Sequence, residues 1–161
     1  MTLHFATPSY TTGTKGVQRG HVLKEPRSID EFNRIKEQLK GAWVLIGGNN
    51  SGFPVDWSEK GDSIRASVIA ENAGIEKKNR ELRASGSKEK PKALKYVPAL
   101  FYKEMVQAGI LGIIQSSSVP IRALYDKNCL DKMTFDNLPP VPDIKLDEKQ
   151  YLLCAVSEIL R

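Results

Sequence analysis

Residues 40–52 read KGAWVLIGGNNSG, and this stretch decides the class of the fold. Its apolar part, Ala42–Ile46, is a short continuous run typical of a strand that is buried on both faces. Gly41 predicts the end of a preceding helix, because glycine accepts the left-handed backbone of a helix cap. The glycine, asparagine and serine residues of 47–52 predict a loop.

Two strands and a helix are expected before this stretch. Residues 3–15 predict an edge strand with a loop, and residues 17–25 alternate weakly, as a strand does. Ser28 and Glu31 have the spacing of a capping box, so the helix that ends at Gly41 is expected to begin there.

After the stretch we expect a long helix that begins near Asp62 or Ser63, a solvated loop over 84–92, and a second helix from Pro98 to Gly109. The apolar residues of the long helix recur at helical spacing and predict one buried face: Ile64, Val68, Ile75 and Leu82.

Residues 110–115 predict a second buried strand, in which Gly112 indicates the close approach of a neighbour. A short strand at 143–146 and a helix capped by Asp147 and Gln150 are expected to follow. Four apolar residues are expected on the buried face of this last helix: Leu152, Ala155, Val156 and Ile159.

Strands and helices thus interleave, which predicts an α/β domain whose sheet is at least partly parallel. The 161 residues suit a single domain. The last helix stops abruptly at Arg161, which predicts a piece cut from a longer polypeptide. No apolar run approaches the roughly 18 residues of a membrane span, and Met1–Tyr10 lacks the pattern of a signal peptide.

One segment carries the whole net charge of +5. Residues 76–95 contain eight basic and three acidic residues, so the rest of the chain is neutral. Such a segment could bind anions or nucleic acid. Nucleic acid is disfavoured, because single-strand binders interleave aromatic residues and this segment has only Tyr96, at its edge. A solvated helix and loop is the simpler interpretation.

Few residues are candidates for metal binding or catalysis. Both need clustered His, Asp, Glu or Cys, but His4 and His21 lie in the N-terminal strands without a carboxylate partner in sequence. Cys129 is expected in a polar loop and Cys154 on the last helix, where the simplest role is that of a small core residue. A disulfide between these two cysteines stays open.

Two further motifs have simple structural interpretations. Ser116–Ser118 follows a predicted strand but lacks the elbow of a serine nucleophile, so a polar exit from the strand is expected. The loop at 47–52 resembles a phosphate cradle but matches neither the Walker pattern nor the dinucleotide fingerprint. A small enzyme that uses Cys129 or Ser116–Ser118 stays as a minor hypothesis.

Three stretches together resemble the protease-associated domain. Residues 40–46 are similar to its glycine-led buried strand, and residues 103–114 to its helix that ends in Ala-Gly before a glycine-containing strand. Residues 138–151 are similar to its closing element, a proline-led strand and a capped helix. Residues 10–25 resemble the lead-in strands of this insert in zinc-dependent exopeptidases of the plasma glutamate carboxypeptidase type. The resemblance spans most of the chain.

This resemblance implies a swivelling β/β/α fold, an open and partly barrelled mixed sheet flanked by helices. It implies a non-catalytic insert that acts as a lid, or as a surface for substrate or protein recognition, beside the active site of a zinc aminopeptidase or carboxypeptidase. The parent peptidase would bind two zinc ions, and neither their ligands nor the catalytic carboxylate belongs to the insert. We therefore expect no catalytic residue, metal or cofactor in this chain.

The resemblance also implies partners and a location. The partners would be the catalytic domain of the parent peptidase and its peptide substrates, and such metallopeptidases are usually secreted or periplasmic. The chain departs from the compact domain between Gly47 and Tyr96, where about residues 62–95 form a basic elaboration. Phe53 and Trp57 are interpreted either as facing the parent peptidase or as covering the end of the core. The alternative function is a free-standing anion- or nucleic-acid-binding domain that uses residues 76–95.

Overall fold

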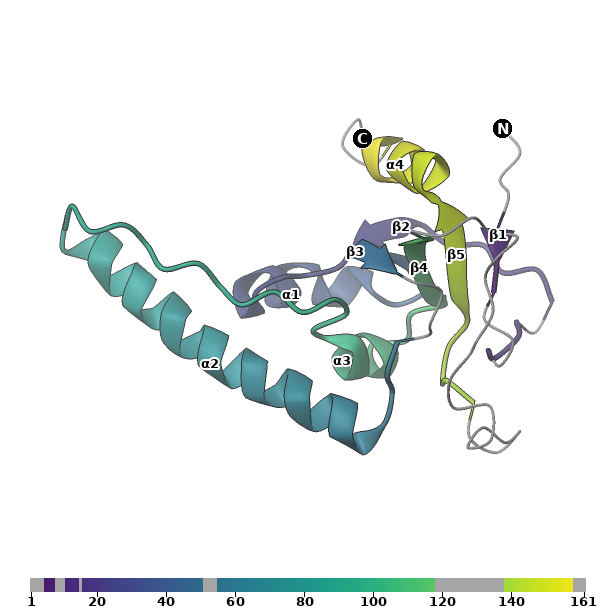
Figure 1. Cartoon of the computed structure of the whole chain (residues 1–161), viewed down its shortest axis with the longest axis horizontal. Coiled ribbons are helices and arrows are strands. Elements are labelled where there is room, and N and C mark those ends of the chain that lie inside the picture. The colour runs from purple at the N-terminus through teal and green to yellow at the C-terminus, as the bar shows by residue number, and fades with distance from the viewer. Residues whose placement is uncertain (1–4, 8–10, 15, 51–54, 118–137, 158–161) are drawn as a thin grey trace.

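The computed structural model describes residues 5–7, 11–14, 16–50, 55–117 and 138–157, and within them five strands form one sheet (Figure 1). The strands are β1 (Phe5–Ala6), β2 (Val22–Lys24), β3 (Trp43–Asn50), β4 (Gly112–Ser117) and β5 (Asp143–Asp147). Their order is β1-β5-β4-β3-β2, with β2 to β5 parallel and β1 antiparallel at the edge. The prediction of an α/β domain with a partly parallel sheet is confirmed.

Helices cover both faces of this sheet. They are α1 (Ile29–Ile35), the 3-10 helix η1 (Lys36–Gln38), α2 (Glu59–Ala84), α3 (Tyr102–Gln107) and α4 (Glu148–Ser157). Figure 1 shows α4 on one face, with α1, α2 and α3 on the other. Strands β2, β3 and β4 follow one another across the sheet, so right-handed crossovers bring their connecting helices to the same face. Within the described residues, no helix is both long and apolar enough to cross a membrane.

The core lies between the sheet and the face that carries α1 and α3. Its buried members come from strands β3 and β4, from α3 and from the segments beside them: Leu39, Val44, Ile46, Ala99, Leu100, Phe101, Tyr102, Met105, Ile110, Ile113 and Val141. Phe32 of α1 stacks on Phe101 with ring centroids 5.1 Å apart. Burial of this apolar surface is the main stabilising force of the domain.

The helix cap at Ser28 and the special glycines predicted from the sequence are present in the structure. The Ser28 Oγ accepts the Glu31 N–H at 3.1 Å and caps α1. Gly41 and Gly109 have φ values of +73° and +87°, the left-handed backbone that glycine tolerates. A β-carbon at Gly112 would collide with the Trp43 ring and lie 2.7 Å from the Pro142 carbonyl oxygen, so the predicted close approach is confirmed.

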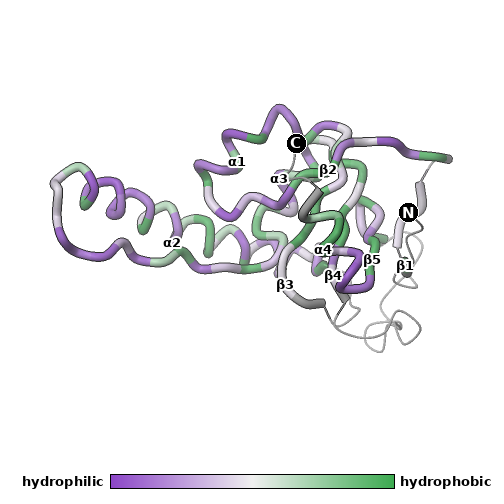
Figure 2. Tube along the Cα trace, turned by 90° about the horizontal axis from the view of Figure 1, so that it is seen from above, coloured by the Kyte–Doolittle hydropathy of each residue, from purple (hydrophilic) through white to green (hydrophobic). Residues whose placement is uncertain are grey.

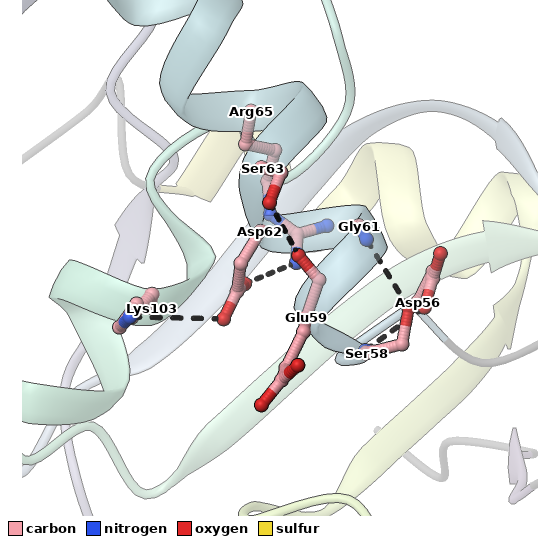
Figure 3. A network of polar contacts seen from close by, with 8 residues as sticks. All are labelled: Asp56, Ser58, Glu59, Gly61, Asp62, Ser63, Arg65 and Lys103. Atoms are coloured by element: carbon pink, nitrogen blue, oxygen red, sulfur yellow. Dashed lines mark hydrogen bonds and ion pairs between the residues drawn. The ribbon is translucent and has the colours of Figure 1, made fainter.

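Helix α2 begins earlier than the sequence predicts. Ser58, not Asp62 or Ser63, caps it, and the Ser58 Oγ accepts the Gly61 N–H at 3.1 Å (Figure 3). Asp56 in turn accepts the Ser58 N–H at 2.9 Å. Burial opposes ionisation of Asp56, but the hydrogen bonds from Ser58 and the nearby cations outweigh it and lower its pKa. Asp62 and Arg65 form an ion pair at 2.6 Å within the first turns.

The predicted buried face of α2 is only partly correct. Ile75 is buried and Val68 and Leu82 are half-buried, but Ile64 is 50% exposed. The other buried residues are small or polar: Gly61, Arg65, Asn72 and Asn79. The reason is that much of α2 packs on an extended segment of the chain rather than on the sheet.

Two asparagines bind that segment to the helix. Asn79 donates to the Lys92 carbonyl and accepts the Lys92 N–H, both at 2.8 Å, and Asn72 makes the same pair of bonds with Lys95 at 2.9 Å. Seven helical residues rise about 10.5 Å, and three extended residues span nearly as much. The spacing therefore lets one helix face bind the backbone N–H and carbonyl groups of two residues of the returning chain.

Helix α2 and the returning segment make a long arm, residues 59–98, that projects from the sheet (Figure 1). Figure 2 shows hydrophilic residues over much of this arm and hydrophobic ones around the strands. Residues 85–91 are exposed, as the predicted solvated loop requires, but the Lys92 backbone is already held by Asn79.

Strands β3 and β4 extend beyond their predicted ends. The predicted loop at Gly47 is part of β3 up to Asn50, because a bulge between Ile46 and Asn49 lets the strand continue beside β4. Ser116 is likewise buried within β4 rather than in a polar exit from it, and Ser117 ends that strand. Ser118 lies outside the described residues.

The predicted buried face of α4 is also wrong at Leu152. Leu152 and Leu153 are 54% and 55% exposed, whereas Tyr151 and Ala155 are half-buried. The Tyr151 hydroxyl donates to the Ile46 carbonyl at 2.7 Å, and this bond rotates the helix so that its Tyr151 side faces the sheet. The side chain of Val156 and the whole of Ile159 lie outside the described residues.

Candidate functional site

A cleft of about 750 Å³ opens at the carboxyl ends of β2 and β3, between α1 and α4. Its apolar lining comes from both faces of the sheet, from Leu23 and Ile35 on the core face and from Leu45 and Ala155 on the face of α4. In parallel sheets, ligands bind outside the carboxyl ends of the strands, and an apolar cleft with a few convergent polar groups is the usual form of a binding site. This position makes the cleft the first candidate site of the domain.

Glu25 joins three parts of the chain at the end of this cleft. It is 6% exposed, and its Oε1 accepts the Gly47 N–H at 2.7 Å and the Tyr96 hydroxyl at 2.8 Å. Its Oε2 accepts the Ala99 N–H at 2.7 Å. One carboxylate thus ties β3 and the root of the arm to the end of β2.

Burial raises the pKa of Glu25, although the three hydrogen bonds and the charge of Arg27 oppose that shift. Burial and the charge of Glu25 raise the pKa of Tyr96 well above its usual range, so Tyr96 stays a hydrogen-bond donor. A shifted carboxyl in a cleft is a candidate for acid–base chemistry. Here, however, three donors from the protein already bind its two oxygens, so Glu25 positions its surroundings.

Gly47 leaves room for this cluster. A β-carbon at Gly47 would lie 2.9 Å from the Tyr96 Oη, 3.2 Å from the Glu25 Oε1 and 3.3 Å from the Arg27 Nη2. Gly48 has a φ of +80°, which other residues rarely adopt. The predicted likeness to a phosphate cradle is not supported at Gly47, because Glu25 binds its N–H.

Cationic side chains stand at the rim of the cleft. The Arg27 guanidinium lies 5.1 Å from the centroid of the Tyr96 ring, a cation–π contact that fixes its position. Arg34 of α1 and Lys24 of β2 also line the cleft and are exposed. The Glu31 carboxylate accepts the backbone N–H of Arg27 at 2.8 Å and so supports the turn before α1.

A second polar cluster lies inside the domain, on the core face of the sheet. The Lys145 ammonium is fully buried and lies 2.9 Å from both carboxylate oxygens of Asp143. Gln115 of β4 donates to the same carboxylate at 3.2 and 3.3 Å. The Val55 N–H reaches it at 3.3 Å. Sequence reasoning missed this cluster, although two charged residues at alternate positions of an apolar strand are a signal for it.

The basic residues of 76–95 lie mainly on the exposed surface of the arm. Arg80 pairs with Asp30 of α1 at 3.1 Å, and Lys95 pairs with Glu71 at 2.8 Å. The other basic side chains of the segment are exposed as well: Lys77, Lys78, Arg83, Lys88, Lys90 and Lys92. The arm therefore presents a cationic surface away from the cleft.

Of the two residues proposed to face a partner, Phe53 and Trp57, the structure describes Trp57 only. Trp57 is half-buried and packs against the core, whereas Phe53 lies outside the described residues. Cys154 is half-buried on α4, where burial raises its pKa, and Cys129 lies outside the described residues. The contact of Phe53 with a host and the disulfide of Cys154 with Cys129 therefore stay open.

Of the two histidines, His21 lies within the described residues and contacts the backbone. The His21 Nε2 lies 2.7 Å from the Gln38 carbonyl oxygen, and His4 lies outside the described residues. In the described part of the chain, no group of three or more His, Cys, Asp or Glu side chains is arranged to hold a metal ion. Comparisons of the chain with protein-family models, with curated proteins and with solved structures find no significant match.

Proposed function

We propose that this chain is a non-catalytic domain of the protease-associated type, inserted in a zinc exopeptidase, where it serves as a lid or a recognition module beside the active site. One observation carries the proposal. The three stretches of the resemblance, 40–46, 103–114 and 138–151, supply parts of the adjacent strands β3, β4 and β5 with the flanking α3 and α4. The resemblance therefore falls on one contiguous part of the domain.

The topology supports an inserted position. Strand β1 pairs with β5, and β5 leads directly into α4, so the first described strand lies beside the strand that precedes the last described helix. A domain tolerated as an insert leaves its host and returns to it at nearby points. A mixed sheet with helices on both faces is also compatible with the finer proposal, a swivelling β/β/α arrangement.

On this proposal the chemistry belongs to the host. The host would supply the two zinc ions, their ligands and the catalytic carboxylate, and it would be secreted or periplasmic. This chain would contribute surfaces that select peptide substrates or protein partners. Phe53 stays a proposed contact with the host, and the packing of Trp57 on the core favours its other interpretation, a cover for the end of the core.

The size and activity of the native product test the proposal. An antibody against this chain is expected to detect, in its own cells, a product far larger than 17.9 kDa. Immunoprecipitated product is expected to release terminal residues from peptides, to lose this activity with a zinc chelator and to regain it with added zinc. A single product of 17.9 kDa without such activity would refute the insert.

The exposed cationic arm favours one alternative, a free-standing anion-binding domain. Such a domain would be retained on heparin, and the triple change of Lys88, Lys90 and Lys92 to Gln would abolish retention. A matched control changes Lys36, Lys40 and Lys149 to Gln, three exposed lysines outside the arm. No retention of the unmodified chain, or equal losses in both triple variants, would remove this alternative.

A further inference from the structure

Strand β2 lies at one edge of the sheet that the described residues form. It pairs with β3 alone, and its pairing uses alternate residues: His21 accepts the Trp43 N–H at 2.8 Å, and Glu25 donates to the Leu45 carbonyl at 2.9 Å. The main-chain groups of Val22 and Lys24 therefore point away from the sheet. Within the described residues, these N–H and carbonyl groups make no backbone hydrogen bond. A free edge of this kind is a template for one more strand.

The cleft lies directly beside this edge. Lys24 and Glu25 line it, and it offers apolar side chains on both faces of the sheet, Leu23 on the core face and Leu45 on the opposite one. An extended peptide on the β2 edge would place alternate side chains on opposite faces of the sheet. One apolar side chain of that peptide would then meet the apolar lining of the cleft, as in known complexes formed by strand addition.

The end of the edge determines which part of a peptide fits. Pro26 has no N–H and cannot extend the ladder, so pairing must stop after Lys24. At this point Arg27 and Arg34 line the cleft. A peptide that runs parallel to β2 would end here with its carboxylate beside two cations, whereas the opposite direction would bring an ammonium group to them.

We infer that the β2 edge and its cleft bind the carboxyl-terminal segment of a peptide, as an added parallel strand whose last side chain is apolar. The hydrogen bonds of Val22 and Lys24 provide general affinity, the cleft selects an apolar side chain, and Arg27 with Arg34 selects the free carboxylate. The inference rests on the proposed recognition role for its biological meaning, since it names the ligand class of that role.

Nuclear magnetic resonance on the purified full chain tests this site. The probe is a mixture of N-acetylated hexapeptides with five random positions and Leu, Ile, Val or Phe at the last one. It is prepared once with free carboxyl termini and once with carboxyl-terminal amides. The free acids are expected to shift the amide resonances of Val22, Lys24 and Gly48 and to bind at least about tenfold more tightly than the amides.

Two variants separate the edge from the cations. Lys24→Pro removes an outward N–H that the sheet does not use, so an edge strand tolerates it, and peptide binding is expected to vanish. Arg34→Gln is expected to keep binding but to remove most of the preference for the free acid. The control is Arg19→Gln, at an exposed arginine outside the cleft, which changes the net charge by the same amount. It is expected to change neither peptide binding nor the preference for the free acid.

Circular dichroism checks that each variant is folded. If Lys24→Pro is not folded, the comparison of Arg34→Gln with its matched control Arg19→Gln tests the inference. Equal binding of acids and amides, or resonance shifts confined to the arm, would overturn the inference. So would the absence of shifts at millimolar peptide. These failures are distinct from that of the insert proposal, because a native product of 17.9 kDa would leave peptide binding by the purified chain unaffected.

Discussion

The sheet and the arm are stabilised in opposite ways. Around β3 and β4 the chain buries apolar side chains against α3, and the central residues, such as Val44 and Met105, are fully buried. Along the arm, Ile75 is the buried apolar residue of α2, and Asn72 and Asn79 bind the returning backbone. Apolar burial makes the sheet a cooperative unit, whereas the contacts of the arm are local and lie near water. We therefore expect the arm to open without unfolding the sheet.

The largest effect is expected from the one buried charge pair described in the sheet. Asp143→Ala removes a carboxylate that lies 2.9 Å from the fully buried Lys145 ammonium. Breaking such a pair costs about 3–5 kcal/mol of unfolding free energy. Urea unfolding measures this loss. The double variant Asp143→Leu with Lys145→Met is expected to recover much of it, because it removes both charges of the pair.

If Asp143→Ala lowered the unfolding free energy by less than about 1 kcal/mol, the pair would contribute little to stability. The contrast between sheet and arm would then rest on apolar burial alone.

The second effect is expected in the arm. Asn79→Ala leaves the Lys92 N–H and carbonyl without partners, which costs about 1–3 kcal/mol locally. Hydrogen exchange is the sharper measurement, since the Lys92 amide is expected to lose its protection while the amides of β3 keep theirs. Asn33→Ala, an exposed asparagine on α1, is the matched control and is expected to change neither. Equal loss of protection in the arm and in β3 would instead make the two regions one cooperative unit.

Glu25 connects the two regions, and its titration tests that connection. Burial raises its pKa in the folded state above the ordinary value of 4.5. The contribution of this group to stability is therefore full below pH 4.5 and is lost as pH rises through the folded pKa. Glu25→Gln removes this titration, because its amide carries no charge.

We expect Glu25→Gln to be less stable at every pH, since its NH₂ group must face donors from Gly47, Tyr96 or Ala99. The gap to the unmodified chain is expected to shrink as pH rises above 4.5. Unfolding by urea at a series of pH values measures this gap. A gap that widens with pH would mean that the hydrogen bonds outweigh burial and that the folded pKa is depressed.

The same contrast explains what the sequence could predict. The strands at Ala42–Ile46 and 110–115 and the caps at Ser28, Gly41 and Gly109 depend on neighbours in sequence, so local patterns reveal them. The buried face of α2 depends on a segment that returns after more than ten residues, and asparagines look like surface residues until that segment is in place. Polar residues that are buried because they bind the backbone do not appear in the periodic pattern of apolar residues that predicts a buried helix face.

The cleft shows the same limit. Glu25 binds Gly47, Tyr96 and Ala99, which follow it by 22, 71 and 74 residues. The sequence places a glutamate at the end of an expected strand, but nothing in its spacing indicates these partners. Charge was equally indirect, because the basic segment 76–95 lies on the arm, whereas the cations of the cleft are basic residues scattered outside that segment.

The smallest effect is expected at the contact between the arm and α1. Arg80 and Asp30 are 3.1 Å apart, but both side chains are more than half exposed. Exposed pairs of this kind contribute about 0–1 kcal/mol, because water screens the charges and two long side chains lose freedom. We expect Arg80→Ala to leave the urea midpoint almost unchanged, even at low salt. If it released the Lys92 amide as strongly as Asn79→Ala does, the arm would be held to the domain at its side as well as at its root, and its motion would be coupled to α1 beside the cleft.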